Sequence, residues 1–142
     1  MKSLNHTLCL KTAEKQQLMN LTTLLRDAVD ASGIQEGVVG IYSQHTTAAV
    51  LVSEFQAALN DDALEFLRRA VDENSFYKHN CPDHSDCDRR NAVSHLRSML
   101  LSHSVLLPVT GGKPILGEFQ SVILAELDGP RERKLQLQIL GV

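Results

Sequence analysis

Aromatic residues are scarce in this chain. The 142 residues include four phenylalanines, two tyrosines and no tryptophan. Proteins that bind single-stranded nucleic acid stack bases on aromatic side chains, so this shortage argues against that class. Fourteen basic residues stand against seventeen acidic ones, and the net charge of −3 offers no attraction to phosphate backbones or anionic lipids. We therefore expect neither nucleic acid nor a membrane among the partners.

Long apolar runs and paired cysteines are lacking too. The longest apolar runs, such as residues 48–52, fall far short of the roughly 20 residues that span a bilayer. The N-terminal residues 1–6 contain no apolar segment of a secretory signal. The three cysteines, Cys9, Cys81 and Cys87, are an odd number without an export signal, which is typical of reduced thiols in the cytosol. The sequence thus predicts a cytoplasmic protein.

The length of the chain fits a single domain, which we take to be residues 1–142. Period-two alternation of apolar side chains is typical of half-buried strands. This alternation and short apolar runs predict strands over residues 3–11, 37–42, 48–53, 104–109, 116–127 and 132–140, with 14–19 as a further candidate. Turns are expected at residues 111–112 and 128–130, where glycine and proline cluster.

Three segments show the spacing of three and four residues that marks an amphipathic helix. The first follows Asn20, interpreted as its N-cap, and ends before a glycine. The second begins near Asn60 with Asp residues in its first turn, and the third runs from about Arg89 to Leu101 with Asp88 as its cap. This order of elements predicts an α+β fold, in which a mixed or antiparallel sheet carries helices packed on one face.

A polar stretch separates two of the apolar strands and is the first candidate for chemistry. It contains His45, Thr46 and Thr47. Burying such groups without partners costs about 1–3 kcal/mol each, so the stretch either forms internal hydrogen bonds as a polar turn or lines a cleft. Asn91 and His95 form a second candidate, because a separation of four residues places them on one helical face. A surface or packing role for the helical histidine is the alternative.

The loop at residues 79–88 contains two histidines, two cysteines and three aspartates. Its cysteines are six residues apart and no second Cys/His pair follows, so the loop does not match a structural zinc site. It also lacks the glycine and the late glutamate of a calcium loop. We instead expect one histidine of this loop to join a ligand from elsewhere in the chain.

The last two predicted strands place charged residues near the core. On the final strand, Arg131 and Arg133 share the parity of the buried leucines, at a position where an unpaired charge is costly. Glu126, Asp128 or a bound anion such as phosphate are the candidate partners, and solvent at the strand end is the alternative. The chain has no glycine-rich phosphate loop, nucleophile elbow or His-Glu-x-x-His motif, so no serine or cysteine nucleophile is supported.

Taken together, these motifs resemble the YjbQ family over roughly residues 37–141. The matching pieces are Gln44-His45-Thr46-Thr47-Ala48 with Glu54, Tyr77-x-His79, Asn91-Ala92-x-x-His95-Leu96, Ser104-Val-Leu-Leu-Pro-Val with Gly112, Gly117-x-Phe119-Gln120, and Glu126-x-Asp128-Gly129-Pro130-Arg131-x-Arg133. Phe119 stands where the family usually has tryptophan, and Glu118 stands where it usually has threonine. The loop between Cys81 and Cys87 is particular to this sequence.

The resemblance implies an α+β fold that assembles as a homotrimer, with pockets near the subunit boundaries. It also implies a weak thiamine-phosphate synthase activity, in which a pyrimidine diphosphate and a thiazole phosphate are joined and pyrophosphate is released. The partner would then be a phosphorylated small molecule.

The residues suit such a reaction in the following roles. Arg131 and Arg133 would stabilise the phosphates of the substrate and of the leaving pyrophosphate. A divalent metal is expected, either Mg²⁺ on Glu126 or Asp128, or Zn²⁺ on a site formed by three histidines. The three histidines are His45, His79 and His95, and the groups expected to orient the ligand are Thr46, Thr47, Asn91 and Gln120.

Two other classes of function could use the same residues. A metal-dependent hydrolase would combine the three histidines with Glu54 or Glu126 as the general base. A non-catalytic trimer would instead hold a small anionic metabolite in a pocket rimmed by arginines. The sequence does not rank the hydrolase against the transferase, because neither leaves a nucleophile signature.

Overall fold

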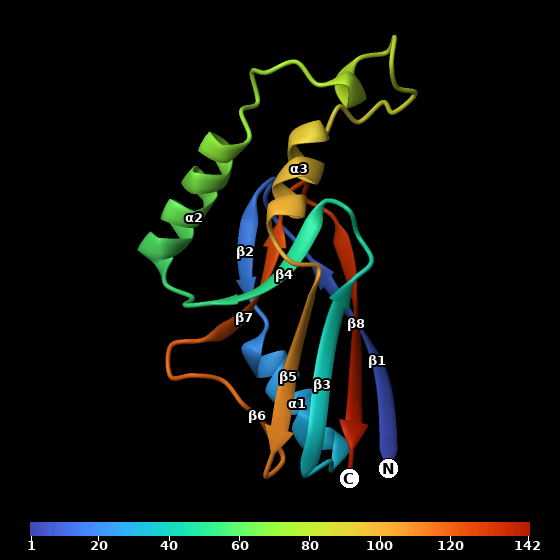
Figure 1. Cartoon of the computed structure of the whole chain (residues 1–142), viewed down its shortest axis with the longest axis vertical. Coiled ribbons are helices and arrows are strands. Elements are labelled where there is room, and N and C mark those ends of the chain that lie inside the picture. Colours follow the sequence, from blue (N-terminus) through green and yellow to red (C-terminus); the bar gives the residue numbers. More distant parts are fainter.

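Strands dominate the structure, a computed structural model that describes residues 1–142. The strands are β1 (Lys2–Lys11), β2 (Gln17–Asn20), β3 (Glu36–Ser43), β4 (Ala48–Ser53), β5 (Ser104–Thr110), β6 (Lys113–Pro114), β7 (Ser121–Glu126) and β8 (Glu132–Gly141). The helices are α1 (Thr22–Ser32), α2 (Ala57–Ala70) and α3 (Ala92–Leu100), and a short 3-10 helix, η1, spans Lys78–Asn80. The predicted α+β class is confirmed (Figure 1).

The strands divide between two antiparallel sheets, whereas the alternation pattern suggested a single sheet. The larger sheet has the order β1-β8-β3-β5-β6 and the smaller has the order β2-β7-β4. The strands β7 and β8, which follow one another across the turn predicted at residues 128–130, therefore lie in different sheets. Alternation shows which side chains point inward, but it carries no information about which strand becomes the neighbour.

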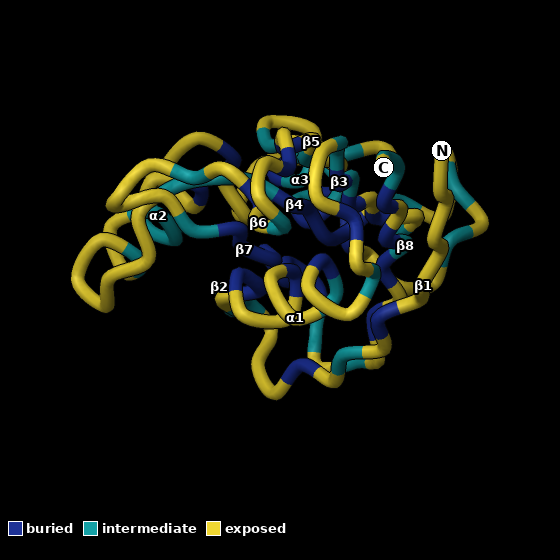
Figure 2. The backbone as a smooth tube through the Cα atoms, turned by 90° about the horizontal axis from the view of Figure 1, so that it is seen from below, coloured by how far each residue is buried: buried dark blue, intermediate teal, exposed yellow.

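The core lies between the two sheets and α1. Leu25 and Val29 of α1 pack with Val50 of β4 and with Leu135 and Leu137 of β8 in one apolar cluster. Figure 2 shows the buried backbone segments gathered in the middle of the molecule, with the exposed segments around them. The predicted inward face of the last strand is confirmed, because every second residue from 133 to 139 is buried.

Helix starts differ from the predictions. The helix α2 begins three residues earlier than expected, because the side chain of Gln56 accepts a hydrogen bond from the Leu59 amide at 2.8 Å and caps it. The acidic residues after Asn60 therefore lie beyond the first turn. Asn20 lies two residues before the first residue of α1, yet its side chain still accepts a hydrogen bond from the Thr22 amide at 3.0 Å.

Two further boundaries affect the site. The helix α3 begins at Ala92 with Asn91 in the N-cap position, so Asp88 is not its cap and residues 89–91 are not helical. The strand expected over 116–127 is shortened to Ser121–Glu126, and residues 115–120 form a loop between β6 and β7. Asn91 therefore lies just before the helix, where its side chain is free to reach other elements.

The helix α2 stands apart from the sheets (Figure 1), and only Leu67 of its residues is fully buried. Arg97 of α3, itself buried, ties the end of α2 to the body. Its guanidinium donates to the carbonyls of Leu67 at 3.2 Å and Val71 at 2.8 Å, and it forms an ion pair with Glu73. The structure contains no helix with the length and apolar character that a bilayer crossing requires.

Candidate functional site

Glu126 and Arg133 form a fully buried ion pair between β7 and β8. The Arg133 Nε atom lies 3.0 Å from both carboxylate oxygens, and Nη2 also donates to the carbonyl and hydroxyl oxygens of Thr47 at 3.0 and 2.9 Å. The hydroxyl of Thr12 donates to Glu126 at 2.7 Å. These contacts engage the guanidinium inside the protein and fix the turn that carries His45.

Three cations converge on the carboxylate of Asp128, which is only 2% exposed. Arg131 and Arg89 donate to it at 3.0 and 3.1 Å, and the ammonium group of Lys15 bonds to its other oxygen. We call these four residues the Asp128 cluster. Three positive charges against one negative charge leave the cluster with a net charge of +2. Because Lys15 and Arg89 are 64% and 57% exposed, this excess positive charge is accessible to an anion.

The environment of Asp128 keeps its carboxylate ionised. Burial raises the pKa of Asp128, but the hydrogen bonds from Lys15 and Asn91, together with the charges of Lys15 and Arg89, outweigh burial and hold the pKa below its ordinary value. Lys15 is positioned by the turn after β7, where the Gly129 amide donates to the Lys15 carbonyl at 3.0 Å. A Cβ atom at Gly129 would lie 2.3 Å from the Glu14 carbonyl, so only glycine permits this approach.

Asn91 connects the Asp128 cluster to His79. Its Nδ2 atom donates to Asp128 at 2.8 Å, and its Oδ1 atom lies 3.1 Å from Nε2 of His79. An ionised carboxylate only accepts hydrogen bonds, so Asp128 fixes the orientation of the amide. Oδ1 therefore faces the ring, and His79 must carry its proton on Nε2. This arrangement leaves Nδ1 of the neutral ring as a free acceptor.

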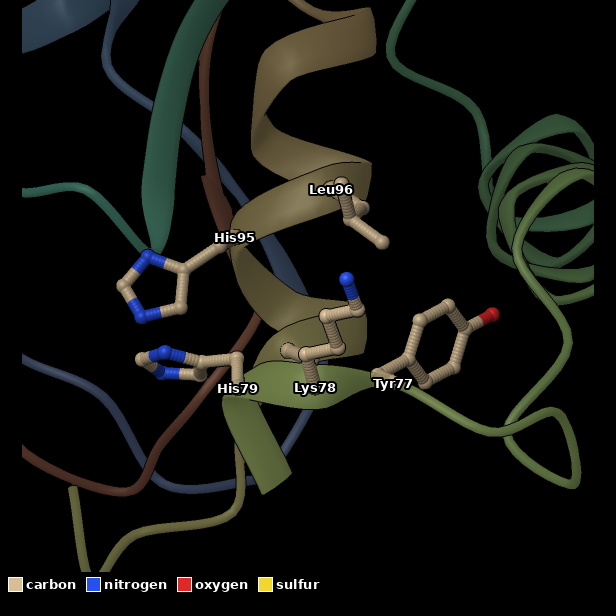
Figure 3. A pocket seen from close by; sticks show the side chains of 6 residues that line it. Tyr77, Lys78, His79, His95 and Leu96 are labelled. Atoms are coloured by element: carbon tan, nitrogen blue, oxygen red, sulfur yellow. The ribbon is translucent and has the colours of Figure 1, made fainter. Parts of the chain in front are cut away.

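His95 of α3 lies against His79. The two rings meet edge to face with centroids 4.9 Å apart, and Figure 3 shows η1 bringing His79 beside the ring that α3 carries. Burial lowers the pKa of His95, and the positive charge that His79 can carry lowers it further. His95 is therefore neutral at pH 7 and able to accept a proton.

His95 belongs to the walls of two pockets. The first, of about 390 Å³, we call the imidazole pocket, and its lining comprises Tyr77, Lys78, His79, Ala92, His95 and Leu96. The second, of about 540 Å³, we call the ring pocket, and its lining includes Tyr42, His45, Thr46, His95, Met99 and His103. In the ring pocket Tyr42 and His103 meet edge to face at 5.5 Å. One imidazole is thus shared between two separate hollows.

His45 enters the ring pocket from the turn between β3 and β4. Its Nε2 atom accepts a hydrogen bond from the Lys134 amide at 2.9 Å, so the proton of the neutral ring lies on Nδ1. Burial, and after it the charge of Arg133, lower the pKa of His45. The ring is consequently neutral near pH 7, with its position fixed from the larger sheet.

The predicted metal site is only partly assembled. His79 and His95 are brought together, but no group of three or more histidine, cysteine, aspartate or glutamate side chains is arranged to hold a metal ion. Glu126 is paired with Arg133, and Asp128 is occupied by the three cations, so neither carboxylate is free for Mg²⁺. The three-histidine site therefore remains a prediction. Of its three proposed ligands, the structure brings His79 and His95 together.

Comparison with known proteins adds the family. The family model described as UPF0047 protein YjbQ-like matches residues 6–142. The chain belongs to this family. A UPF0047 protein of Methanothermobacter thermautotrophicus is 35% identical over 132 residues, covering 93% of this chain and 88% of that protein. The UPF0047 protein YugU of Bacillus subtilis is 28% identical over 135 residues, with 95% and 98% covered.

Solved structures share the whole fold. A YbjQ-like protein of unknown function from Sulfolobus solfataricus superimposes with a TM-score of 0.91 at 32% identity, covering 99% of each chain. A hypothetical protein from Aeropyrum pernix K1 gives a TM-score of 0.86 at 34% identity, covering 100% of each chain. The predicted family membership is confirmed.

One predicted site residue of the YjbQ motif lies apart from the imidazoles. The side chain of Gln120 accepts a hydrogen bond from the Gly117 backbone amide at 2.8 Å, and the backbone amide of Gln120 donates to the Gly117 carbonyl at 3.1 Å. This turn belongs to the loop between β6 and β7, well separated from η1 and α3 in Figure 1. Phe119 at its tip is 68% exposed. Gln120 thus closes a surface turn within its own subunit.

The remaining predicted residues divide between the two pockets and the buried pair. Thr46 lines the ring pocket, whereas Thr47 is buried against Arg133.

Sequence reasoning missed Lys15 and Arg89, which stand in loops without a periodic pattern and far from Asp128 in sequence. The sequence offers one signal for them, because a buried aspartate requires positively charged partners. Residue spacing does not identify which lysine or arginine supplies that charge.

Proposed function

We propose that this YjbQ-family chain is a small-molecule transferase that acts on phosphorylated substrates, in the manner of the thiamine-phosphate synthases that its sequence resembles. The observation that carries the proposal is the position of His95 between two pockets. A group-transfer enzyme must hold a donor and an acceptor at the same time, with an acid–base group between them. A hydrolase needs only one such pocket and water.

The Asp128 cluster is the proposed phosphate anchor. Its net charge of +2 and the exposure of Lys15 and Arg89 suit a phosphate or pyrophosphate group, and Asn91 joins the cluster to the imidazole pocket. Of the two arginines expected to bind phosphate, Arg131 serves directly. Arg133 supports the site from inside, because its donors are directed at Glu126 and Thr47.

The ring pocket would then hold the heterocyclic acceptor against Tyr42 and His103. In the transfer, the carbon–oxygen bond to pyrophosphate breaks as the nitrogen–carbon bond to the acceptor forms. The pyrophosphate leaves with the bonding electrons, and the cations stabilise its charge. His95 and His79 would exchange a proton with the substrates, and Thr46 with its neighbour His45 would orient the acceptor.

A non-catalytic binder of a small anion is the second candidate, because the Asp128 cluster alone suffices for it. The metal-dependent hydrolase draws less support, since a Zn²⁺ site would need His45 to join His79 and His95. If a divalent ion is held, His79 and His95 would supply its nitrogen ligands. A cytoplasmic location is proposed on the sequence argument alone.

We propose a homotrimer as the assembled form. Phe119 at the loop tip, Ile115 in the same loop and Leu106 on β5 are large exposed apolar side chains that a second subunit would cover. Assembly would also give Gln120 a role at the site, since the loop of one subunit would reach the pockets of its neighbour. Mixing His95→Ala and Gln120→Ala chains tests this, because a shared site regains activity in the mixture.

The decisive experiment combines thermal melting with turnover. In a chelating buffer, pyrophosphate at 100 times its dissociation constant stabilises the protein by about 2.7 kcal/mol, which raises the melting temperature by roughly 5 °C or more. Arg89→Gln should weaken this shift, and the control Arg26→Gln, in α1, should not. Formation of thiamine phosphate from the two phosphorylated halves supports the transferase. Anion binding without any turnover would favour the binder, and stabilisation that requires Zn²⁺ would favour the metal-dependent hydrolase.

A further inference from the structure

The loop between η1 and α3 carries two cysteines that the proposed chemistry does not use. Cys81 and Cys87 are both free thiols and both partly buried, whereas Cys9 is exposed on β1. The loop lies at the far end of the molecule from the chain termini, beyond α3 (Figure 1).

Each cysteine is two residues from a residue of the site. Cys81 follows His79, and Cys87 precedes Arg89 of the Asp128 cluster. Both arms of the loop are anchored at their bases, His79 by Asn91 at 3.1 Å and Arg89 by Asp128 at 3.1 Å. The interval from Cys81 to Cys87 is therefore the free part that joins two fixed arms.

Backbone hydrogen bonds fold this interval back on itself. The Cys81 carbonyl accepts from the amides of His84 at 3.0 Å and Ser85 at 2.9 Å, and the Ser85 hydroxyl accepts from the Cys87 amide at 3.1 Å. A turn thus lies between the two cysteines, within the free part of the loop. Cys9 belongs to β1, an edge strand of the larger sheet, and has no second cysteine in its own segment of the chain.

We propose that Cys81 and Cys87 form a peroxide-sensitive modification site that closes as a disulfide. A thiolate of one cysteine attacks hydrogen peroxide, which breaks the oxygen–oxygen bond, gives a sulfenic acid and releases hydroxide. The thiol of the other cysteine then attacks the sulfenic sulfur, which forms the sulfur–sulfur bond and releases water. The two thiols are oxidised by two electrons in total, and the peroxide is reduced.

The cross-link closes a ring of the residues from Cys81 to Cys87 and ties the arm of His79 to the arm of Arg89. A covalent ring reduces the number of arrangements open to the loop, so both arms are held ready for a ligand. Oxidation is thus expected to tighten anion binding at the Asp128 cluster. This consequence rests on the proposed function, whereas formation of the disulfide does not.

Peptide mapping of the whole protein tests the cross-link. Trypsin cleaves after Lys78 and Arg89, so both cysteines lie in one peptide, and a disulfide lowers its mass by about 2 Da without joining it to another peptide. After peroxide treatment, the thiol count should fall from three to one per chain. Cys9→Ser should leave the mass change intact, and Cys87→Ser should replace it with a sulfenic acid trapped at Cys81. Three remaining thiols, or addition of oxygen without the mass loss, would overturn the proposal.

Binding measurements test the consequence separately. The dissociation constant of pyrophosphate should fall at least two-fold in the oxidised protein, and Cys81→Ser should show no response to peroxide. Equal affinity in the oxidised and reduced forms would refute the link between the disulfide and the site. If neither form binds pyrophosphate, the proposed phosphate anchor fails, while the mass measurement still decides the modification.

Discussion

The buried pair of Glu126 and Arg133 supports a quantitative prediction, because two of the roles predicted for Glu126, internal partner of Arg133 and general base, give opposite results. If Glu126 is the internal partner of Arg133, Glu126→Gln leaves a buried guanidinium without its counter-charge. Removing one partner of a buried ion pair costs about 3–5 kcal/mol. The amide oxygen of the new side chain can still accept one hydrogen bond, and Thr47 still accepts two. We therefore expect Glu126→Gln to lower the free energy of unfolding by the low end of this range, about 3 kcal/mol.

Such a loss is large against the roughly 5–15 kcal/mol that stabilises an ordinary domain. At about 2–4 °C per kcal/mol for a chain near this length, the melting temperature should fall by roughly 6–12 °C. Differential scanning calorimetry at pH 7 measures the fall. Glu132→Gln is the matched control, because it removes the same charge from an exposed neighbour on β8 and should move the melting temperature little.

A second substitution strengthens the test. Adding Arg133→Met to Glu126→Gln removes the unpaired charge and should recover part of the lost stability. If Glu126→Gln instead melts within about 2 °C of the unaltered protein and yet abolishes turnover, the pair is not the structural element described above. Glu126 would then be the general base of the hydrolase alternative.

Three further predictions concern the imidazoles and the surface. Asn91→Leu should lower turnover at least ten-fold with little change in KM, because His79 loses the contact that fixes its tautomer; nitrogen chemical shifts that still report a proton on Nε2 would contradict this. The folded-state pKa values of His45 and His95 lie below 6.5, so the two rings contribute stability at higher pH that is lost as pH falls below about 6.5. Replacing both with Gln should flatten the melting temperature between about pH 6.5 and pH 5, and an unchanged slope would refute it. Phe119→Glu should shift the oligomer toward monomer in light scattering, and an unaltered mass would exclude the loop from the interface.

The inward face of β8 illustrates what the sequence determines. Alternation places Arg133 on the side of the buried leucines, and the cost of a buried charge requires a partner, so the sequence alone names Glu126 as a candidate. The sequence does not decide between Glu126 and an external anion as the partner, because alternation along a strand does not show how deeply a side chain is buried. Only the packing of the smaller sheet over Arg133 decides that the partner is internal.

The sequence predicts helix starts and strand partners less well. Gln56 is an uncommon N-cap, so the polar run after Asn60 gave the stronger but misleading signal. The pairing of β7 with β2 and β4 depends on contacts between residues 68 to 109 positions apart, and local pattern does not encode them. The same limit hid Lys15 and Arg89, which reach Asp128 only through the course of their loops.

Arg97, which holds the end of α2, affects how this helix unfolds locally. Because Leu67 is the only fully buried side chain of α2, little apolar surface opposes its detachment, and Arg97 supplies the main polar contact at its end. We expect α2 to behave as a separate cooperative unit, whose amide hydrogens exchange at a lower free energy than those of β8. Arg97→Met should bring that exchange closer to the free-solution rate without affecting β8. The chain would then have two levels of stability, a durable core of strands and a helix that detaches and returns while the core stays folded.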